Sequence, residues 1–218
     1  RPRGIIPVDL FGQPADYARI NAVAARHDLF VIEDAAQSFG GTSAGVRTGK
    51  LAHVACASFF PAKPLGCAGD GGALFTDDAT QAELFRSVRV HGQGSDRYEN
   101  VRLGLTGRLD ALQAAVLLGK LDIFVDELTA RDRIAARYSR DISARALGLT
   151  TPYVAAGMTS AWAQYSILTR DSAHRTACRE SLQAAGIPSM IYYPKPLHLQ
   201  PVFSGLGYRA GDFPVGED

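Results

Sequence analysis

Apolar segments and an amphipathic helix alternate along the first third of the chain. Residues 5–8 form a short apolar run, and residues 29–32 form a second, continuous one. Between them, from residue 14 to about residue 27, apolar side chains recur at helical spacing. A continuous apolar strand is typical of burial on both faces. A strand, a helix and a strand in this order predict a crossover between parallel strands.

The middle of the chain predicts two further strands and two helices. Residues 54–60 and 72–76 have strand patterns and are joined by a glycine-rich loop. Helical patterns follow at about 81–89 and about 110–140. The second helix is long and contains Gly119, and glycine weakens helix interiors. We therefore expect this helix to be interrupted.

The last third of the chain changes character. Residues 163–168 are a candidate strand, residues 172–185 form an amphipathic pattern, and the chain is extended and proline-rich from residue 187. A strand–helix–strand unit after a long linking helix indicates a second domain. We therefore expect an α/β protein in which residues 1–140 belong to a large domain and its linking helix, and residues 141–218 to a smaller C-terminal α+β domain.

Composition narrows the class of protein. The 218 residues are 46% hydrophobic and 21% charged, with a net charge of +1, so they offer no basic surface for nucleic acid. No apolar run approaches the roughly 20 residues that span a bilayer. Three cysteines without metal-ligand spacing fit a reducing compartment, so we expect a soluble cytoplasmic protein. Scattered histidines predict no metal site; they include His53, His91 and His198.

Two residues carry candidate chemistry. Asp34 ends the second apolar strand, and open α/β sheets bind ligands at the carboxyl ends of their strands. An aspartate at this place equally often caps a loop. Lys63 is flanked by prolines and aromatic residues instead of charges, which predicts a partly desolvated amine able to form an imine. The alternative is an ordinary surface lysine.

An aspartate at a strand end and a lysine on a later loop are the pair that pyridoxal 5'-phosphate (PLP) chemistry needs. The carboxylate keeps the pyridine nitrogen protonated, and the lysine holds the aldehyde as an imine and then moves the proton. Ser58 is placed to donate its hydroxyl to the cofactor phosphate, and Gln37 to bond the phenolic oxygen of the ring. The candidate cofactor-binding residues are therefore Asp34, Gln37, Ser58 and Lys63.

Several longer motifs resemble one known family. The chain reads Glu33-Asp34-Ala35-Ala36-Gln37-Ser38, then Ser58-Phe59-Phe60-Pro61-Ala62-Lys63-Pro64-Leu65-Gly66, then Gly107-Arg108-Leu109-Asp110-Ala111, and finally Tyr193-Pro194-Lys195-Pro196-Leu197-His198. These motifs resemble, in order and over essentially the whole chain, the DegT/StrS family of sugar-nucleotide aminotransferases. The resemblance implies the fold of PLP-dependent transferases of fold type I, a mostly parallel sheet with flanking helices.

The resemblance also implies an activity. Members move an amino group from L-glutamate to a nucleotide-linked keto sugar through a lysine aldimine, which falls on Lys63, and they form homodimers with shared active sites. The likeness is strongest to the bacterial enzymes that aminate 3-keto sugars and UDP-linked keto-hexuronic acids for surface polysaccharides such as the lipopolysaccharide O-antigen. The implied partners are therefore a sugar nucleotide, glutamate and a second copy of the chain.

Residue by residue, the resemblance gives Lys63 the aldimine and Asp34 the pyridinium partner. Arg108 falls where members place an arginine near the active site, which makes it a candidate clamp for a pyrophosphate or a carboxylate. From the C-terminal domain, three side chains are candidates to contact the sugar, although packing between the domains explains them nearly as well: Tyr192, Tyr193 and His198.

This chain departs from the family at three points. Thr106 stands where members usually have an asparagine that reaches the partner's phosphate, and Tyr192 stands where many have a histidine. Compared with the family, the chain is also truncated at both ends. The alternative to a transaminase is therefore a non-catalytic or truncated member that acts as a binding or regulatory module. Lys63 favours the enzyme, and it argues against the sugar 3-dehydratase branch, which has a histidine in its place.

Overall fold

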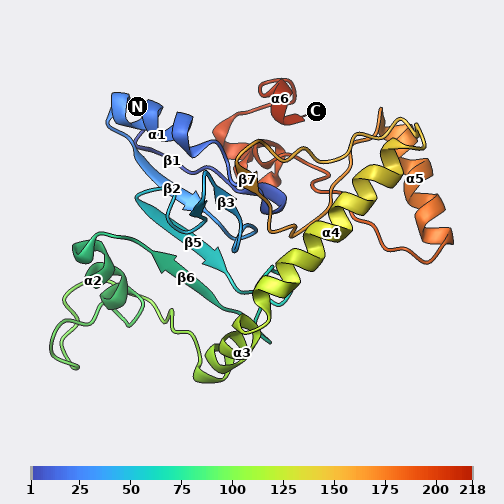
Figure 1. Cartoon of the computed structure of the whole chain (residues 1–218). Coiled ribbons are helices and arrows are strands. Elements are labelled where there is room, and N and C mark those ends of the chain that lie inside the picture. Colours follow the sequence, from blue (N-terminus) through green and yellow to red (C-terminus); the bar gives the residue numbers. More distant parts are fainter. Residues whose placement is uncertain (1, 218) are drawn as a thin grey trace. The chain divides into compact units, whose positions relative to one another are not determined.

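A four-stranded sheet in the order β1-β2-β5-β6 forms the centre of the computed structural model, which describes residues 2–217 (Figure 1). β1, β2 and β5 run parallel, and β6 pairs antiparallel with β5. The four strands span Gly4–Ile5, Phe30–Asp34, Val54–Ser58 and Gly72–Phe75. The helix α1 (Tyr17–His27) joins β1 to β2, so the predicted crossover between parallel strands is confirmed.

The helices begin where the sequence supplies capping groups. The Asp16 side chain accepts a hydrogen bond from the Arg19 N–H at the start of α1, and Asp78 caps the first turn of α2 (Ala79–Val88) in the same way. Such caps satisfy backbone donors that a helix leaves unpaired. The long predicted helix is divided into α3 (Ala111–Leu121) and α4 (Phe124–Ser143). Its interruption is therefore confirmed, and it lies just beyond Gly119.

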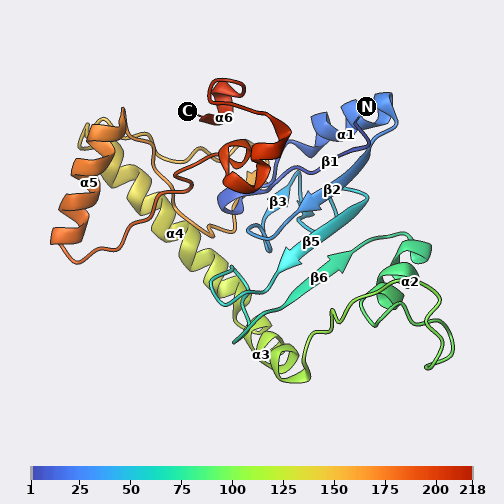
Figure 2. The same cartoon turned by 180° about the vertical axis from the view of Figure 1, so that it is seen from behind.

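The larger of two hydrophobic clusters lies at the carboxyl end of β5. In both views the junction of α3 and α4 lies beside this end (Figures 1 and 2). Burying a large apolar side chain contributes about 1.5–3 kcal/mol, so the cluster fixes the loop after β5 against the two helices. Its buried members are Ala57, Phe59, Leu65, Cys67, Leu117 and Phe124.

A second, small sheet has no counterpart in the sequence pattern. Its antiparallel order is β4-β3-β7, with strands Val46–Arg47, Thr42–Ser43 and Met158–Thr159. Strands of two residues are too short to show an alternating pattern, which explains why the pattern did not predict them. This sheet joins residues about a hundred positions apart, since Thr42 pairs with Thr159.

The described chain divides into two compact units, one up to Leu168 and one from Thr169 onward. The second unit contains α5 (Ser172–Ala184), the 3-10 helices Leu197–Leu199 and Pro201–Leu206, and α6 (Pro214–Glu217). The helix predicted at 172–185 is thus confirmed. A boundary between domains near residue 140 stays a prediction for the full-length protein.

The strand predicted at 163–168 is wrong. Leu168 makes only an isolated bridge, with Thr150, and no strand is assigned between residues 160 and 217. A strand requires a neighbouring strand to satisfy its N–H and C=O groups, and the apolar pattern alone does not supply one. In the described part of the chain, no helix is both long and apolar enough to cross a lipid bilayer.

Candidate active site

The register of the sheet places Asp34 and Ser58 on one face. Asp34 of β2 pairs with Cys56 of β5, and paired residues of neighbouring strands project to the same face. Ser58 lies two residues beyond Cys56, so it projects to that face as well. Because β2 and β5 are parallel and both end here, the two polar side chains lie at the carboxyl edge of the sheet, where ligands bind in open α/β sheets.

The backbone of Asp34 is held from both sides. Its N–H donates to Pro7 O at 3.0 Å, and its carbonyl accepts from the Asp9 N–H at 3.0 Å. On the other side, the Ala35 N–H donates to Cys56 O at 2.9 Å. A residue fixed in this way presents its side chain in one direction, as a preorganised site requires.

One oxygen of the Asp34 carboxylate is used within the chain. Oδ1 accepts from the Ala36 N–H at 3.1 Å. Within residues 2–217, the carboxylate forms no ion pair, and Oδ2 has no hydrogen-bond donor. Asp34 is half-buried, so this oxygen is suited to accept a hydrogen bond from a cationic ring nitrogen of a ligand.

The loop that carries Lys63 is rigid. It follows β5, and Pro64, Leu65, Gly66 and Cys67 are all buried. A Cβ on Gly66 would lie 2.6 Å from Pro61 O, so only glycine fits there. Two cationic side chains, one from α3 and one from α4, donate hydrogen bonds to carbonyls of this loop. Lys120 Nζ donates to Gly66 O at 2.6 Å, and Arg131 donates to Pro64 O at 3.0 Å.

Lys63 itself is half-buried, and its N–H closes a turn by donating to Phe60 O at 2.9 Å. Among the described residues its amine has no carboxylate partner, in contrast to Lys50, which pairs with Asp77 at 3.5 Å. The loop leaves the carboxyl end of β5, the same edge of the sheet that carries Asp34. The arrangement therefore supplies an amine and a carboxylate at one edge, on two rigid supports.

Ser58 and Gln37 are both oriented by backbone groups. Ser58 Oγ accepts from the Phe60 N–H at 3.3 Å, which leaves its own hydrogen to donate. Gln37 Oε1 accepts from the Phe11 N–H at 2.7 Å, so its amide is fixed by the turn at residues 10–12. The cofactor roles expected for the two residues stay predictions. Their fixed geometry fits a phosphate donor and a ring contact.

Arg108 is connected to His91. The guanidinium lies 3.3 Å from His91 Nε2, and Thr106 Oγ1 lies 3.4 Å from His91 Nδ1. Arginine only donates, so Nε2 must accept, and the ring proton then lies on Nδ1 and is donated to Thr106. Thr106, at the position where the resemblance expects an asparagine, thereby orients the ring against which Arg108 rests.

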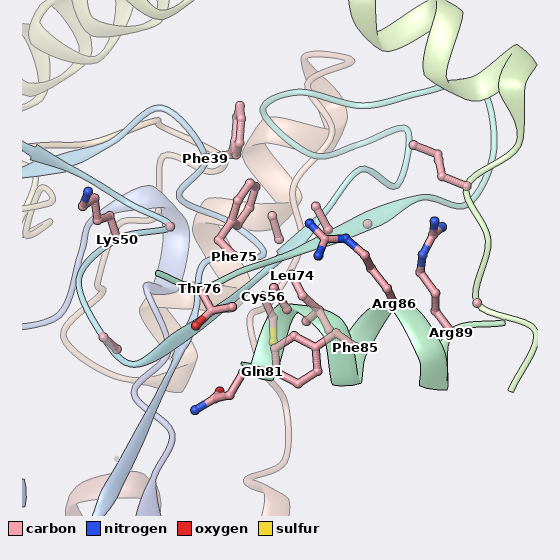
Figure 3. A pocket seen from close by; sticks show the side chains of 18 of the residues that line it. Phe39, Lys50, Cys56, Leu74, Phe75, Thr76, Gln81, Phe85, Arg86 and Arg89 are labelled. Atoms are coloured by element: carbon pink, nitrogen blue, oxygen red, sulfur yellow. The ribbon is translucent and has the colours of Figure 1, made fainter. Parts of the chain in front are cut away.

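A large cavity of about 1360 Å³ lies beside β6 and α2, and Arg108 lines it (Figure 3). Its lining includes the apolar side chains of Leu74, Phe75 and Phe85, together with Arg86 of α2 and Arg89, which directly follows α2 (Figure 3). Asp34, Gln37, Ser58 and Lys63 are not among its lining residues, so this cavity is separate from the candidate cofactor residues. Cys56 belongs to both regions, because it lines the cavity and is the register partner of Asp34.

The three C-terminal candidates lie in the second unit. His198 Nε2 lies 2.9 Å from Glu217 Oε1, and its ring packs against Phe213. The rings of Tyr192 and Tyr193 form a T-shaped pair with centroids 5.4 Å apart, and both side chains are exposed. Contact of these residues with a sugar stays a prediction. Packing explains His198 in this unit, while the side chains of the two tyrosines are exposed.

Sequence reasoning missed two buried carboxyl groups beside Asp34. Asp9 and Glu33 are both 0% exposed. Glu33 accepts hydrogen bonds from Gly49 N–H at 2.7 Å and Leu51 N–H at 2.9 Å. Burial raises the pKa of Glu33 to about 7, with the charge of Asp9 adding to the effect. The available signal was a carboxylate directly after each of two apolar segments, residues 5–8 and 29–32.

The raised pKa of Glu33 predicts a pH dependence of stability. The pKa of Glu33 in the folded chain, about 7, exceeds the ordinary glutamate value of 4.5, so the stabilisation that its protonated form contributes is complete below pH 4.5 and is lost as pH rises through 7. At 1.36 kcal/mol per unit, the free energy of unfolding should fall by roughly 2 to 3 kcal/mol between pH 5 and pH 8. Urea denaturation across this range measures the fall.

The variant Glu33→Gln is the control for this pH dependence. It loses an acceptor for one of the two backbone N–H groups, so it should be less stable than the wild type at pH 5. Because the titrating group is gone, its free energy of unfolding should change little between pH 5 and pH 8. A wild-type protein whose stability rises over this range would contradict the assignment.

Comparisons with protein families, curated proteins and solved structures identify relatives of this chain. The model of the DegT/DnrJ/EryC1/StrS aminotransferase family matches residues 1–218. UDP-2-acetamido-2-deoxy-3-oxo-D-glucuronate aminotransferase of Pseudomonas aeruginosa is 46% identical over 217 residues, which cover all of this chain and 58% of that protein. The chain therefore spans little more than half the length of this curated relative.

Two of the solved structures that are similar to this chain show the shared fold. A DegT DnrJ EryC1 StrS aminotransferase from Brucella abortus is 54% identical with a TM-score of 0.88, over 94% of this chain and 53% of that one. NtdA of Bacillus subtilis, solved with bound cofactor PMP, is 28% identical with a TM-score of 0.83, over 96% of this chain and 48% of that one. The fold class expected from the sequence, fold type I of the PLP-dependent transferases, is confirmed by these likenesses.

Proposed function

Because the chain belongs to the DegT/DnrJ/EryC1/StrS aminotransferase family, we propose that the full-length protein is a PLP-dependent transaminase. It moves an amino group from L-glutamate to a keto sugar linked to a nucleotide. The observation that carries this proposal is the amine of Lys63, on a rigid loop at the same sheet edge as the Asp34 carboxylate. Among the described residues, Lys63 is half-buried and has no carboxylate partner, and it follows the same sheet edge as Asp34. A binding or regulatory module has no need for such a lysine.

The residues present fit the cofactor. When bound, PLP supplies an electron-accepting ring that stabilises negative charge at the carbon carrying the amine. Asp34 Oδ2 accepts the hydrogen bond of the ring nitrogen and so keeps the proton on that atom. Lys63 Nζ would hold the aldehyde of the cofactor and would be the group that carries the proton between substrate atoms. Ser58 donates its hydroxyl to the phosphate, and the Gln37 amide orients the ring.

The substrate class follows from the chemistry of the relative and the charges of this chain. The P. aeruginosa relative is named for a UDP-linked 3-oxo sugar acid, which supports a 3-keto sugar nucleotide here. Such a substrate carries a pyrophosphate, and Arg108 supplies a guanidinium able to bind it in a bidentate manner. Tyr192, Tyr193 and His198 contact the sugar in this proposal.

A panel of acceptors tests the proposed function. The full-length protein is incubated with L-glutamate and with 3-keto and 4-keto sugars carrying UDP or dTDP, and the 2-oxoglutarate formed is measured. We expect turnover with the UDP-linked 3-keto sugars. Turnover with 4-keto sugars alone would overturn the 3-position preference. No turnover with any acceptor would favour the binding module.

We expect the full-length protein to form at least a homodimer with shared active sites. Arg108 and Thr106 lie on an exposed segment, and in this proposal they reach the cofactor of the partner. Most soluble oligomers form closed two-fold dimers. Analytical ultracentrifugation should give the mass of a dimer at micromolar concentration, and a fully active monomer would contradict the shared site.

A cytoplasmic location completes the proposal. The cysteines Cys56, Cys67 and Cys178 are all unpaired. Cys67 is buried, and its sulfur lies 2.9 Å from the carbonyl oxygen of Phe59 and 3.0 Å from that of Gly69, so its one proton is shared between the two acceptors. Unpaired thiols persist in a reducing compartment.

A further inference from the structure

Asp9 lies on the far side of the sheet from the candidate cofactor residues. Val8 and Asp34 form a parallel bridge, so their side chains share one face. Asp9 follows Val8 and Glu33 precedes Asp34, and both side chains therefore project to the opposite face. The two buried carboxyl groups thus lie together directly behind Asp34.

The Asp9 carboxylate connects two segments of the chain. Oδ1 accepts from the Tyr17 hydroxyl at 2.8 Å and from the Ala15 N–H at 3.0 Å, at the start of α1. Oδ2 accepts from the Ser38 hydroxyl at 2.7 Å. Ser38 ends the turn that follows Asp34 and contains Gln37, and this turn is closed by the Ser38 N–H donating to Ala35 O at 3.1 Å.

The Asp9 backbone adds a contact to Asp34 itself. Its N–H donates to Asp34 O at 3.0 Å. Asp9 therefore holds the strand end through its backbone and the following turn through its side chain. Asp34 and Gln37, the two residues assigned to the cofactor ring, both lie within this stretch of chain.

Asp9 and Glu33 are also two buried carboxyl groups whose charges interact. Within residues 2–217, neither carboxyl group forms an ion pair, so ionising both in the interior is costly, and burial raises the pKa of each carboxyl group above its ordinary value. Asp9 accepts three donors and Glu33 accepts two, all from neutral groups.

We propose that Asp9 is a positioning residue for the cofactor site, and that its hydrogen bond to Ser38 fixes the turn carrying Gln37 behind Asp34. This inference rests on the proposed function, because it assigns the turn to the PLP ring. Asp9 does not touch the ring; it acts through Ser38 and through the backbone of Asp34. The bond to Tyr17, by contrast, anchors α1 and has no part in the site.

The difference between the two hydroxyl donors gives a matched test. Ser38→Ala and Tyr17→Phe each remove one hydroxyl from the same carboxylate, at donor distances of 2.7 Å and 2.8 Å. Ser38 is 0% exposed and Tyr17 is 3% exposed. A merely structural role predicts similar losses of thermal stability and no further difference between the variants.

Two measurements on the full-length protein separate the roles. In the cofactor-free protein, amide hydrogen exchange of residues 35–38 should become on the order of tenfold faster in Ser38→Ala and stay at the wild-type rate in Tyr17→Phe. PLP affinity, followed by absorbance, should fall on the order of tenfold in Ser38→Ala only.

Equal exchange rates in the two variants would overturn the inference, whatever the cofactor result. Faster exchange in Ser38→Ala with unchanged PLP affinity would also overturn it, since the turn would then be irrelevant to the ring. A wild-type protein that binds no PLP would instead overturn the proposed function, and with it the assignment of the turn to a cofactor site. The expected result is the selective effect of Ser38→Ala in both measurements.

Discussion

Replacing Lys63 by alanine should abolish both the cofactor absorbance band of the full-length protein and its turnover. Without the amine, the chain cannot hold the aldehyde covalently, and it loses the group proposed to move the proton. The rate should fall on the order of ten-thousandfold, to the background of the assay. Absorbance spectra and 2-oxoglutarate formation are measured on the same preparation.

Lys50→Ala is the matched control for this experiment. Lys50 is exposed and forms a surface ion pair with Asp77, which contributes at most about 1 kcal/mol. This variant should keep the band and the wild-type rate. A Lys63→Ala protein that still transaminates near the wild-type rate would exclude Lys63 as the residue that binds the cofactor.

Replacing Asp34 by asparagine should leave PLP bound but slow the reaction on the order of a thousandfold, or about 4 kcal/mol of activation free energy. Asparagine keeps the shape of the side chain and still accepts from the Ala36 N–H. It lacks the charge that holds a proton on the ring nitrogen, so the ring accepts electrons less readily. Turnover at saturating glutamate and the bound-cofactor band are the two measurements.

Asp28→Asn provides the control for the loss of a carboxylate. Asp28 is exposed at the end of α1, in the left-handed conformation with φ 51°, which asparagine adopts readily. Its substitution should change neither turnover nor stability measurably. If Asp34→Asn retained more than about a tenth of the wild-type rate, the carboxylate would have no role at the ring nitrogen.

The parts of the fold that the sequence predicted depend on local pattern. The crossover from β1 through α1 to β2 follows from the apolar runs and the helical spacing between them. The interruption near Gly119 follows from helix propensity. The strand expected at 163–168 failed because pairing depends on a neighbour that the pattern does not reveal. The small sheet of Thr42, Arg47 and Thr159 was missed for the same reason.

The candidate site likewise has some features that are local in the sequence and others that depend on tertiary contacts. Asp34 and Lys63 were recognisable because strand ends and proline-flanked lysines are local features. The network of Asp9, Tyr17 and Ser38 joins residues up to 29 positions apart, and only the fold brings them behind Asp34. The contact of Arg108 with His91 across 17 positions is a further tertiary feature. Long-range polar contacts of this kind cannot be derived from spacing along one chain.

The central claim is that Lys63 and Asp34 hold PLP for amino transfer. The most direct test is an absorbance titration of the purified full-length protein with PLP, then L-glutamate, then a UDP-linked 3-keto sugar. We expect a bound-cofactor band that glutamate removes and the keto sugar restores, as the amine enters and leaves the protein. A band that does not respond to glutamate, or no band at all, would contradict it.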